Sequence, residues 1–369
     1  MARLVLLGGG HAHMTVMASL NEFLDRGHEV RVVGPEPYHY YSGMGPGMLG
    51  GHYTPEEIRF DIRRMVESKG ASFVEDKAER IDAASRVVHL ASGQHLEYDV
   101  LSCNTGSVVD QRLAAPDATN VYTVKPIANL LAAQKRIKDL ASSKSELRIG
   151  VVGGGPAALE VAGNALSWAH RVNASSPKVT VFGGKEFLRR HPGKVRQFAI
   201  MSLEQRGIEL VQGSYVDKVT GSRIVLEDGS SADVDLVFLA QGVRPSPLFR
   251  ASDVAVGPNG GLAVNEYLQS TEEPSIFGGG DCIHFEPEPL DKVGVYAVRE
   301  NPILKANLMA QLEGKELTPF DPGDGYLLIF NLGDGTGIFW RKKTIFHGRP
   351  AFWLKDFIDR RFMKRFQKA

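Results

Sequence analysis

Two glycine clusters, each between an apolar run and a segment able to form a helix, are the parts of this sequence most able to do chemistry. The first covers residues 8–10 and follows the run 3–7; the second covers residues 153–155 and follows the run 147–152. Glycine at a strand-to-helix turn lets the chain turn tightly and brings backbone N–H groups close to a pyrophosphate. Two such turns predict two dinucleotides in one chain, with electrons passing from one to the other.

Both turns depart slightly from the full G-x-G-x-x-G pattern. In the first turn His13 occupies the third position, whereas Gly153, Gly155 and Ala158 complete the pattern in the second. A single glycine turn also serves purely structural roles. A strand before the turn, a helix after it and the repetition of the whole arrangement make the dinucleotide interpretation much stronger.

The elements that must position these turns form two similar blocks. Strand, helix and strand are expected at 3–7, 14–26 and 29–33, and the same order returns over 147–183. Each block is followed by a buried strand that ends at a glycine, and a further buried strand covers 275–277. This duplication predicts one Rossmann-like domain inserted into another.

Between these blocks the sequence predicts less regular structure. Residues 37–53 are dense in Tyr, Gly and Pro, so we expect an irregular loop there. Thr54 followed by Pro55 is typical of a helix N-terminus and predicts a helix that runs towards Ser68. Another helix is expected at about 293–312, before a small strand-rich segment and a final basic helix.

Composition is that of a globular protein of two domains. The 369 residues carry no net charge, so we expect no nucleic-acid partner, and no run approaches the ~20 apolar residues of a membrane span. No signal peptide is recognisable, because the first apolar run stops at Gly8. Only Cys103 and Cys282 occur, in no redox spacing, which fits a reducing compartment. We therefore expect a cytoplasmic protein.

Three further stretches carry a resemblance to a known family. Residues 101–106, 238–245 and 276–282 resemble the strand-and-turn motifs of the two-dinucleotide flavoproteins, the pyridine nucleotide-disulfide oxidoreductase-like enzymes. The resemblance implies an α/β fold with two Rossmann-like three-layer domains, bound FAD, and NADH or NADPH as substrate. It implies that Asp281 contacts the ribityl chain or phosphate of FAD; the alternative is an Asp that caps a turn.

The implied domains divide the chain into four parts. The expected boundaries are 1–118 and 262–325 for the FAD domain, 119–261 for the inserted NAD(P) domain, and 326–369 for C-terminal strands and a basic amphipathic helix.

Within the family, the order of motifs is most similar to type II NADH dehydrogenases and sulfide:quinone oxidoreductases. Glu160 falls in a Leu-Glu-x-Ala-Gly stretch whose glutamate, in the dehydrogenases, lies near the flavin–nicotinamide contact. Glu160 is therefore the expected catalytic residue, with an ordinary helix carboxylate as the alternative. Residues 9–13 and 41–53 resemble the NADH-dehydrogenase-like module associated with selenophosphate synthetase.

The resemblance also implies binding residues. Those expected to hold FAD are Gly8, Gly10, His11, Ala12, Glu36, Ser42, Ala78, Thr105, Gly106, Asp281 and Tyr296. Those expected to hold the nicotinamide dinucleotide are Gly153, Gly155, Ala158, Lys185 and Gly242. No metal site is expected, because the spacing of His11, His13, His39 and His52 matches no common ligand set.

The sequence departs from the family pattern where strands meet the ribose. The acidic residue expected after the second strand of each block is replaced by Gly34 and by Gly183. Glu36 lies close enough to reach the adenosine ribose of the first site. Lys185 is placed to pair with a 2′-phosphate at the second, so NADPH is at least as plausible as NADH; another alternative is that this site binds no nicotinamide.

The electron acceptor is less well defined. Both cysteines read as small buried residues, which disfavours persulfide chemistry, and Val295 and Arg299 occupy positions where the dehydrogenases have quinone-path glutamines. We predict an FAD-dependent oxidoreductase that passes electrons from NAD(P)H to a quinone-type acceptor. The alternatives are a sulfide:quinone or other chalcogen-handling flavoprotein, and an electron-carrier flavoprotein linked to selenium metabolism.

The C-terminal tail points to a membrane surface. Residues 341–369 hold ten Lys/Arg and two acidic residues. Leu354, Ile358, Phe362 and Phe366 are spaced by four and predict an apolar stripe, which Trp353 and Phe357 widen. Such a helix can lie among anionic headgroups, which predicts a peripheral protein on the inner face of the cell membrane. The alternative is packing on its own domain or on a homodimer partner.

Overall fold

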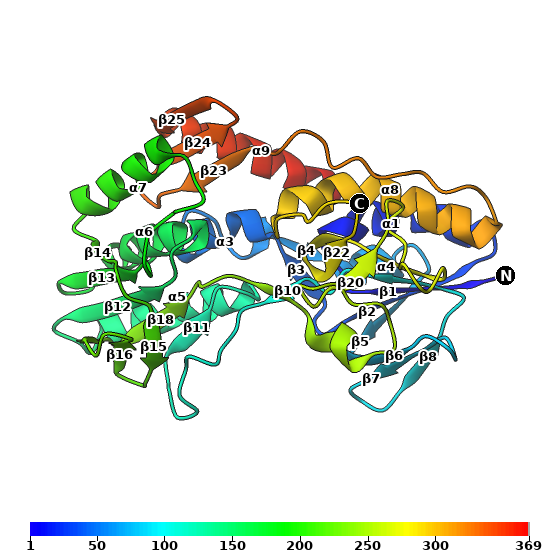
Figure 1. The fold of residues 1–369 in the computed structure, drawn as a ribbon, viewed down its shortest axis with the longest axis horizontal. Helices are drawn as coiled ribbons and strands as arrows, with labels where there is room; N and C mark the ends of the chain where they lie inside the picture. The colour runs from blue at the N-terminus through cyan, green and yellow to red at the C-terminus, as the bar shows by residue number, and fades with distance from the viewer. Residues whose placement is uncertain (368–369) are drawn as a thin grey trace.

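The computed structural model describes residues 1–367, which form two lobes, each built on a five-stranded parallel sheet (Figure 1). The strand order in the first lobe is β21-β9-β1-β2-β5. Its strands are β1 Arg3–Leu7, β2 Glu29–Gly34, β5 Ser72–Glu75, β9 Val100–Cys103 and β21 Ile276–Gly278. The central strands are buried on both faces, which is why their sequences are almost continuously apolar.

The second lobe repeats this arrangement with the order β11-β18-β12-β13-β14. Its strands are β11 Val121–Thr123, β12 Leu147–Val152, β13 Pro177–Phe182, β14 Glu209–Val211 and β18 Leu236–Leu239. Strand β21 joins the first sheet only after the chain has completed the second sheet. The second lobe is therefore inserted into the first, and the predicted α/β fold of two Rossmann-like domains is confirmed.

Helices pack on both sheets. Those of the first lobe are α1 Met14–Ala18, α2 Leu20–Leu24, α4 Ile62–Glu67 and α8 Gly294–Glu313; those of the second are α5 Ala128–Ala141, α6 Pro156–Arg171 and α7 Gly193–Gln205. α6 begins with Pro156 directly after Gly155, and α8 ends at Gly314, whose φ of +66° suits glycine. Both signals set where the two long helices begin or end.

Each lobe also carries a three-stranded antiparallel meander. The strands are β6 Ala78–Asp82, β7 Val87–Leu90 and β8 His95–Glu97 in the first lobe, and β15 Val216–Val219, β16 Arg223–Leu226 and β17 Ser231–Asp233 in the second. Short pairs complete the fold: β10 Ser107–Val108 with β19 Arg244–Pro245, and β20 Leu262–Val264 with β22 Ile283–Phe285. The β10–β19 pair lies where the chain crosses between the lobes.

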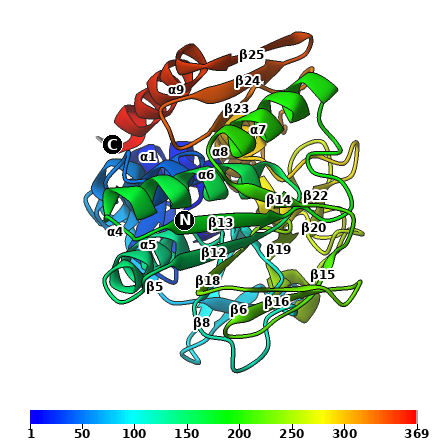
Figure 2. The same cartoon turned by 90° about the vertical axis from the view of Figure 1, so that its left-hand side faces the viewer.

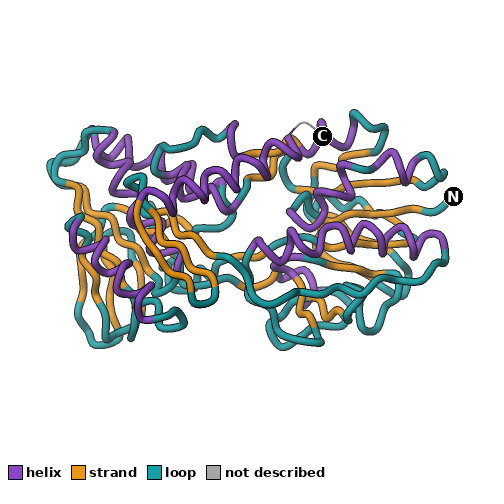
Figure 3. Tube along the Cα trace, turned by 90° about the horizontal axis from the view of Figure 1, so that it is seen from above, coloured by secondary structure: helices purple, strands orange, loops and turns teal. Residues whose placement is uncertain are grey.

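The C-terminal segment connects the two lobes. It consists of a three-stranded sheet, β23 Leu328–Asn331, β24 Gly337–Arg341 and β25 Thr344–Gly348, followed by helix α9 Arg349–Gln367. The small sheet packs on α6 and α7 of the second lobe (Figure 2). Helix α9 then crosses to the first lobe, where it packs on strand β4 Arg59–Asp61 (Figure 3).

Residues 37–53 are more regular than the sequence predicts. They contain strand β3 Tyr38–Tyr40, which pairs with β4, and helix α3 Gly45–Leu49. The helix predicted from Thr54 towards Ser68 is right only in its last part, where α4 covers Ile62–Glu67. Thr54 and Glu57 do form a reciprocal cap, but only one 3₁₀ turn follows before the chain pairs as β4. Long-range strand pairing therefore overrides the local helix signal.

Two other helices differ from expectation. The helix predicted at 14–26 is split into α1 and α2, which meet at Ser19. The apolar stripe predicted along α9 is divided between two faces: Phe362 and Phe366 pack on the protein, whereas Ile358 is exposed. Among the described residues, no helix is long and apolar enough to cross a membrane.

Candidate active site

The first glycine turn lies against the end of the neighbouring strand β9. A side chain at Gly8, whose φ is +91°, would place Cβ 2.3 Å from the carbonyl oxygen of Asn104. A Cβ at Gly10 would lie 2.7 Å from Asn104 Nδ2. Both glycines are therefore required by the packing of the turn itself, whatever the turn binds.

Three buried polar atoms beside this turn have no hydrogen-bond partner among residues 1–367. They are His11 Nε2, Asn104 Nδ2 and Thr105 Oγ1. Leaving such a group unpaired costs roughly 1–3 kcal/mol, so each atom fits a polar ligand. FAD offers phosphate, hydroxyl and ring acceptors and donors of this kind. Thr105 and His11 are among the predicted FAD residues, whereas Asn104 is not, although its position at the end of a buried strand was a usable signal.

Asp281 lies in a short 3₁₀ turn, Gly280–Cys282, directly after β21. Its carboxylate accepts a hydrogen bond of 2.7 Å from Ser107 Oγ and forms an ion pair with Lys125. Burial alone raises the pKa of Asp281, but Lys125 and Ser107 hold it below its ordinary value. The sequence predicted Asp281 and missed Lys125, because 156 residues separate the two partners.

The other predicted FAD residues lie in three places. Ser42 Oγ lies 3.7 Å from the Cβ position of Gly294, the first residue of α8, and Tyr296 follows in the first turn of that helix. Glu36 and Ala78 lie further along, beyond the ends of β2 and β5. The remaining two are Ala12, buried in the turn Gly10–His13, and Gly106, which follows Thr105.

The second glycine turn follows β12 as the first follows β1, but its last glycine is less crowded. A Cβ at Gly153 would lie 2.3 Å from Ala240 O, so this glycine is again needed for packing against the adjacent strand end. A Cβ at Gly155 would meet no atom within 4 Å. Gly155 precedes a helix of 16 residues, and Ala158 is buried in its first turn. The space before this helix N-terminus suits a pyrophosphate.

Two further predicted residues border this second turn. Lys185 is exposed, and its Nζ lies 5.7 Å from the centre of the Tyr215 ring. Gly242 lines a cavity of about 400 Å³ together with Asp110, Arg112 and Arg244. Tyr215 was not predicted as a site residue, because a single exposed aromatic in a meander carries no sequence signal.

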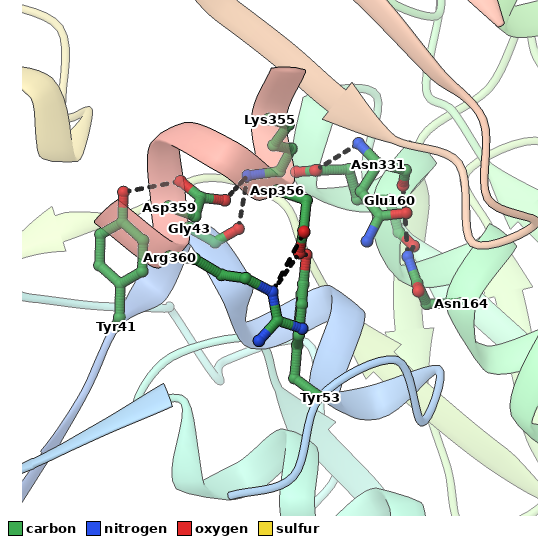
Figure 4. A network of polar contacts seen from close by, with 10 residues as sticks. All are labelled: Tyr41, Gly43, Tyr53, Glu160, Asn164, Asn331, Lys355, Asp356, Asp359 and Arg360. Atoms are coloured by element: carbon green, nitrogen blue, oxygen red, sulfur yellow. Dashed lines mark hydrogen bonds and ion pairs between the residues drawn. The ribbon is translucent and has the colours of Figure 1, made fainter. Parts of the chain in front are cut away.

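Glu160 lies where helix α6 meets the C-terminal segment (Figure 4). Its Oε1 accepts a hydrogen bond of 2.8 Å from the backbone N of Asn331. Burial raises the pKa of Glu160 to about 7, although the nearby charge of Lys355 lowers it. A carboxyl with this pKa exists in both protonation states near neutral pH, which suits proton transfer.

Lys355 belongs to the buried side of α9. Its Nζ donates hydrogen bonds of 2.7 Å to Gly43 O and 2.8 Å to Asp359 Oδ2, and Asp359 Oδ1 accepts one of 3.0 Å from Tyr41 OH (Figure 4). Asp356, one turn away on the same helix, accepts a hydrogen bond of 2.9 Å from Tyr53 OH. Sequence reasoning missed the contacts of α9 with the first lobe, because more than 300 residues separate the partners in each.

Both cysteines are buried and free, as predicted. Cys282 Sγ donates to the backbone oxygens of Cys103 and Gly279, and burial raises its pKa to about 11. Burial also raises the pKa of Cys103 well above its ordinary value. Among the described residues, no group of three or more His, Cys, Asp or Glu side chains is arranged to hold a metal ion.

The comparisons with known proteins agree with this geometry. The pyridine nucleotide-disulphide oxidoreductase family matches residues 2–299. The chain belongs to this family. It is therefore an oxidoreductase, with FAD as its cofactor and NADH or NADPH as its co-substrate. The orphaned polar atoms at the first turn and the open helix N-terminus at the second are consistent with these two dinucleotides.

Relatives within the family are distant. Over 319 residues the oxidoreductase is 26% identical to the probable ferredoxin reductase CtmF of Castellaniella defragrans, with 81% of this chain and 72% of that protein covered. Sulfide:quinone oxidoreductase from Aquifex aeolicus has a similar fold, with a TM-score of 0.76, 16% identity, and coverage of 100% and 92%. NDH2 from Plasmodium falciparum, in complex with NADH, gives a TM-score of 0.77, 15% identity, and coverage of 100% and 99%.

Proposed function

We propose that this oxidoreductase passes electrons from NADH or NADPH, through FAD, to a quinone-type acceptor at the surface of an anionic membrane. The observation that carries the proposal is helix α9. Its inner side packs on both lobes beside the predicted flavin residues, while its outer side carries exposed aromatic and basic residues. A lipid-borne quinone stays in the membrane, so an enzyme that reduces it must bring its flavin to the membrane surface.

The outer side of α9 combines aromatic and basic residues. Trp353 is 64% exposed and Phe357 is 62% exposed, and Ile358 lies beside them. Exposed basic residues follow on the same helix: Arg361, Lys364 and Arg365. Aromatic side chains favour the headgroup boundary, and each basic residue near an anionic leaflet contributes about 1 kcal/mol. This charge complementarity supports an anionic membrane as the partner of the outer side.

Different residues of the chain would bind the cofactor and hold a proton. When bound, FAD supplies a two-electron carrier between nicotinamide and acceptor. Asp281, held by Lys125, would orient the ribityl or phosphate end. Glu160 would hold a proton near the contact of α6 with β23, and the charge of Lys355 would lower its pKa. The main work of the protein is alignment of the two dinucleotides.

The test begins with the purified yellow protein under anaerobic conditions. NADH, NADPH or sulfide is added, and the visible absorbance of the flavin is followed. Bleaching by a nicotinamide, reversed by a soluble quinone, supports the proposal. Bleaching by sulfide alone would favour the chalcogen-handling alternative. Fast bleaching of the flavin by a nicotinamide, followed by slow recovery of its absorbance with every small acceptor, would favour an electron-carrier flavoprotein. That alternative includes a flavoprotein linked to selenium metabolism.

The membrane part needs its own experiment. Co-sedimentation with phosphatidylglycerol vesicles is compared with phosphatidylcholine vesicles. We expect binding to the anionic vesicles only, and loss of binding in a Trp353→Ser/Phe357→Ser double variant. Val256 is also exposed but lies in another part of the chain, so Val256→Ser serves as the matched control and should bind like the wild type. Equal binding by all three proteins would contradict a role for α9.

A further inference from the structure

An exposed tyrosine lies beyond the carboxyl end of β14, the edge strand of the second sheet (Figure 1). This residue, Tyr215, has a side chain that is 42% exposed, and outside α9 no aromatic side chain of residues 1–367 is more exposed. A large ring that stays in water forgoes the free energy of burial. Because the ring lies at the edge of the sheet that carries the second glycine turn, we examined it for contact with a ligand.

The ring is positioned by the loop that follows β13. Gly184, whose φ is +70°, lies against it, and a Cβ there would be 2.8 Å from the nearest atom of the Tyr215 ring. The loops after β13 and β14 are joined by a hydrogen bond of 2.9 Å from Gly213 N to Gly184 O. Tyr215 O accepts another, of 2.9 Å, from Glu227 N. The exposed ring therefore stands on a backbone that is hydrogen-bonded on two sides.

A positive charge faces the same ring. Lys185 Nζ lies 5.7 Å from the ring centre, and within residues 1–367 Lys185 forms no ion pair. The carboxylate next to it in the chain, that of Glu186, is bound by Arg196. Gly183 and Gly184 contribute no side chain. The space beyond β13 therefore combines an aromatic face with a cation, which suits a base that carries a phosphate close by.

The order of the strands predicts that the adenosine half of a dinucleotide lies in this space. In a Rossmann unit the pyrophosphate binds at the turn after the first strand, here β12, and the ribose is reached from the end of the second, here β13. Neighbouring strands are about 4.8 Å apart. One strand farther in the same direction is the end of β14, so the base comes to lie beside Tyr215. The nicotinamide half would run the opposite way, across β18 towards Gly242.

We propose that Tyr215 is the platform on which the adenine of NADH or NADPH stacks, with Lys185 beside it for the 2′-phosphate of NADPH. The adenine would take the place of the Lys185 ammonium over the ring, and the ammonium would turn to the phosphate. The inference rests on the proposed function for its donor alone, since the electron acceptor plays no part in it. Both donors carry adenine, so Tyr215 would strengthen the binding of both equally, whereas Lys185 would favour NADPH.

The decisive experiment uses nucleotides that cannot transfer electrons. AMP and 2′,5′-ADP differ only in the 2′-phosphate, and each is titrated into FAD-loaded protein in a calorimeter. In Tyr215→Ala we expect Kd for both nucleotides to rise about tenfold, within the range of base–aromatic stacking. Tyr215→Phe keeps the ring and should bind both like the wild type. In Lys185→Met only Kd for 2′,5′-ADP should rise, by about fivefold.

A second exposed tyrosine serves as the matched control. Tyr38 is 38% exposed and has the Arg59 guanidinium 4.3 Å from its ring centre, but it lies in β3 of the first lobe. Tyr38→Ala should leave both Kd values unchanged. Tyr215→Leu is measured beside Tyr215→Ala, because it keeps an apolar side chain at the position but lacks an aromatic face. It should bind as weakly as Tyr215→Ala.

Nuclear magnetic resonance of protein labelled on its tyrosine rings gives a second readout. The Tyr215 signal is identified by its absence from the spectrum of Tyr215→Phe. We expect AMP to shift this signal upfield, because the ring current of adenine acts on a ring stacked against it. A Tyr215 signal that AMP does not move would overturn the platform, as would wild-type binding of both nucleotides by Tyr215→Ala.

Failure of the platform differs from failure of the proposed function. If nicotinamides bleach the flavin of the wild type and Tyr215→Ala binds both nucleotides normally, only the platform is overturned. If nicotinamides do not bleach the flavin but nucleotide binding still depends on Tyr215, the proposed function falls and the platform stands. If the wild type binds neither nucleotide, the platform is overturned whatever the flavin does.

Discussion

The two dinucleotide turns occupy equivalent places, after β1 and after β12, but have very different surroundings. At the first turn, buried polar atoms of His11, Asn104 and Thr105 have no partner in the described chain, and the ion pair of Asp281 lies close by. At the second, Gly155 faces open space and Lys185 is exposed. The first site thus fits a cofactor that stays bound, and the second fits a substrate that enters and leaves.

The comparison makes a general point about duplicated folds. A glycine turn is needed in both copies for the same steric reason, because a Cβ at Gly8 or Gly153 would collide with a neighbouring backbone oxygen at 2.3 Å. What distinguishes the copies is the burial and charge that other segments add. Changes at the first site should therefore affect cofactor content and stability, and changes at the second should affect kinetics.

The largest effect should come from Asp281→Ala. The Asp281 side chain is 10% exposed, so its removal leaves the charge of Lys125 without its partner in a mostly buried position. We expect the free energy of unfolding to fall by about 3 kcal/mol and the flavin content to drop. Urea denaturation and the flavin-to-protein absorbance ratio measure the two effects. As a control, Asp253→Ala breaks an exposed pair with Arg80 and should cost less than about 1 kcal/mol.

The next effect concerns the pH dependence of stability alone, without loss of flavin. Glu300 is 1% exposed, and burial raises its pKa from 4.5 to about 7. Between these values the folded protein binds more protons than the unfolded chain, so the free energy of unfolding falls as pH rises. In Glu300→Gln this fall should shrink by about 3 kcal/mol, the free energy that corresponds to the difference between these two pKa values. Denaturant titrations at several pH values measure it; Glu272→Gln, at an exposed position, should follow the wild type.

At the second site, Gly155→Val should change kinetics and leave stability intact. The open space in front of Gly155 accepts the side chain, but a pyrophosphate would then lose its approach to the helix N-terminus. We expect KM for the nicotinamide to rise about tenfold, or about 1.4 kcal/mol, with unchanged flavin content. A matching Gly153→Val variant should instead unfold more easily. If both variants behaved alike, the distinction between packing and binding glycines would be lost.

The smallest expected effect concerns the choice of nicotinamide. Lys185 is exposed beside Tyr215, and Gly183 and Gly184 leave no carboxylate at the end of β13. In Lys185→Glu, the ratio of kcat/KM for NADPH to that for NADH should fall about fivefold, which corresponds to a surface charge interaction of about 1 kcal/mol. Steady-state kinetics with both donors measure the ratio. An unchanged ratio would mean that Lys185 does not contact a 2′-phosphate.

The sequence by itself determined the parts that depend on local pattern. Apolar runs before glycine clusters predicted both sheets, because strands buried on two faces must be apolar and the turns after them must be tight. A count of charges found the basic character of the tail, and the resemblance of residues 276–282 to a flavoprotein motif singled out Asp281. These features are readable because their physical causes lie within a few residues of one another.

Only the tertiary structure decided which side chains bind one another and which side of α9 is buried. Lys125 reaches Asp281 across 156 residues, and Lys355 of α9 reaches Gly43 across 312. The periodicity of α9 predicted one apolar stripe, yet Phe362 packs inward beside Lys355 and Asp359 while Trp353 stays outside. Periodicity describes a helix in isolation. Which side becomes buried depends on hydrogen bonds and ion pairs with segments that only folding brings near.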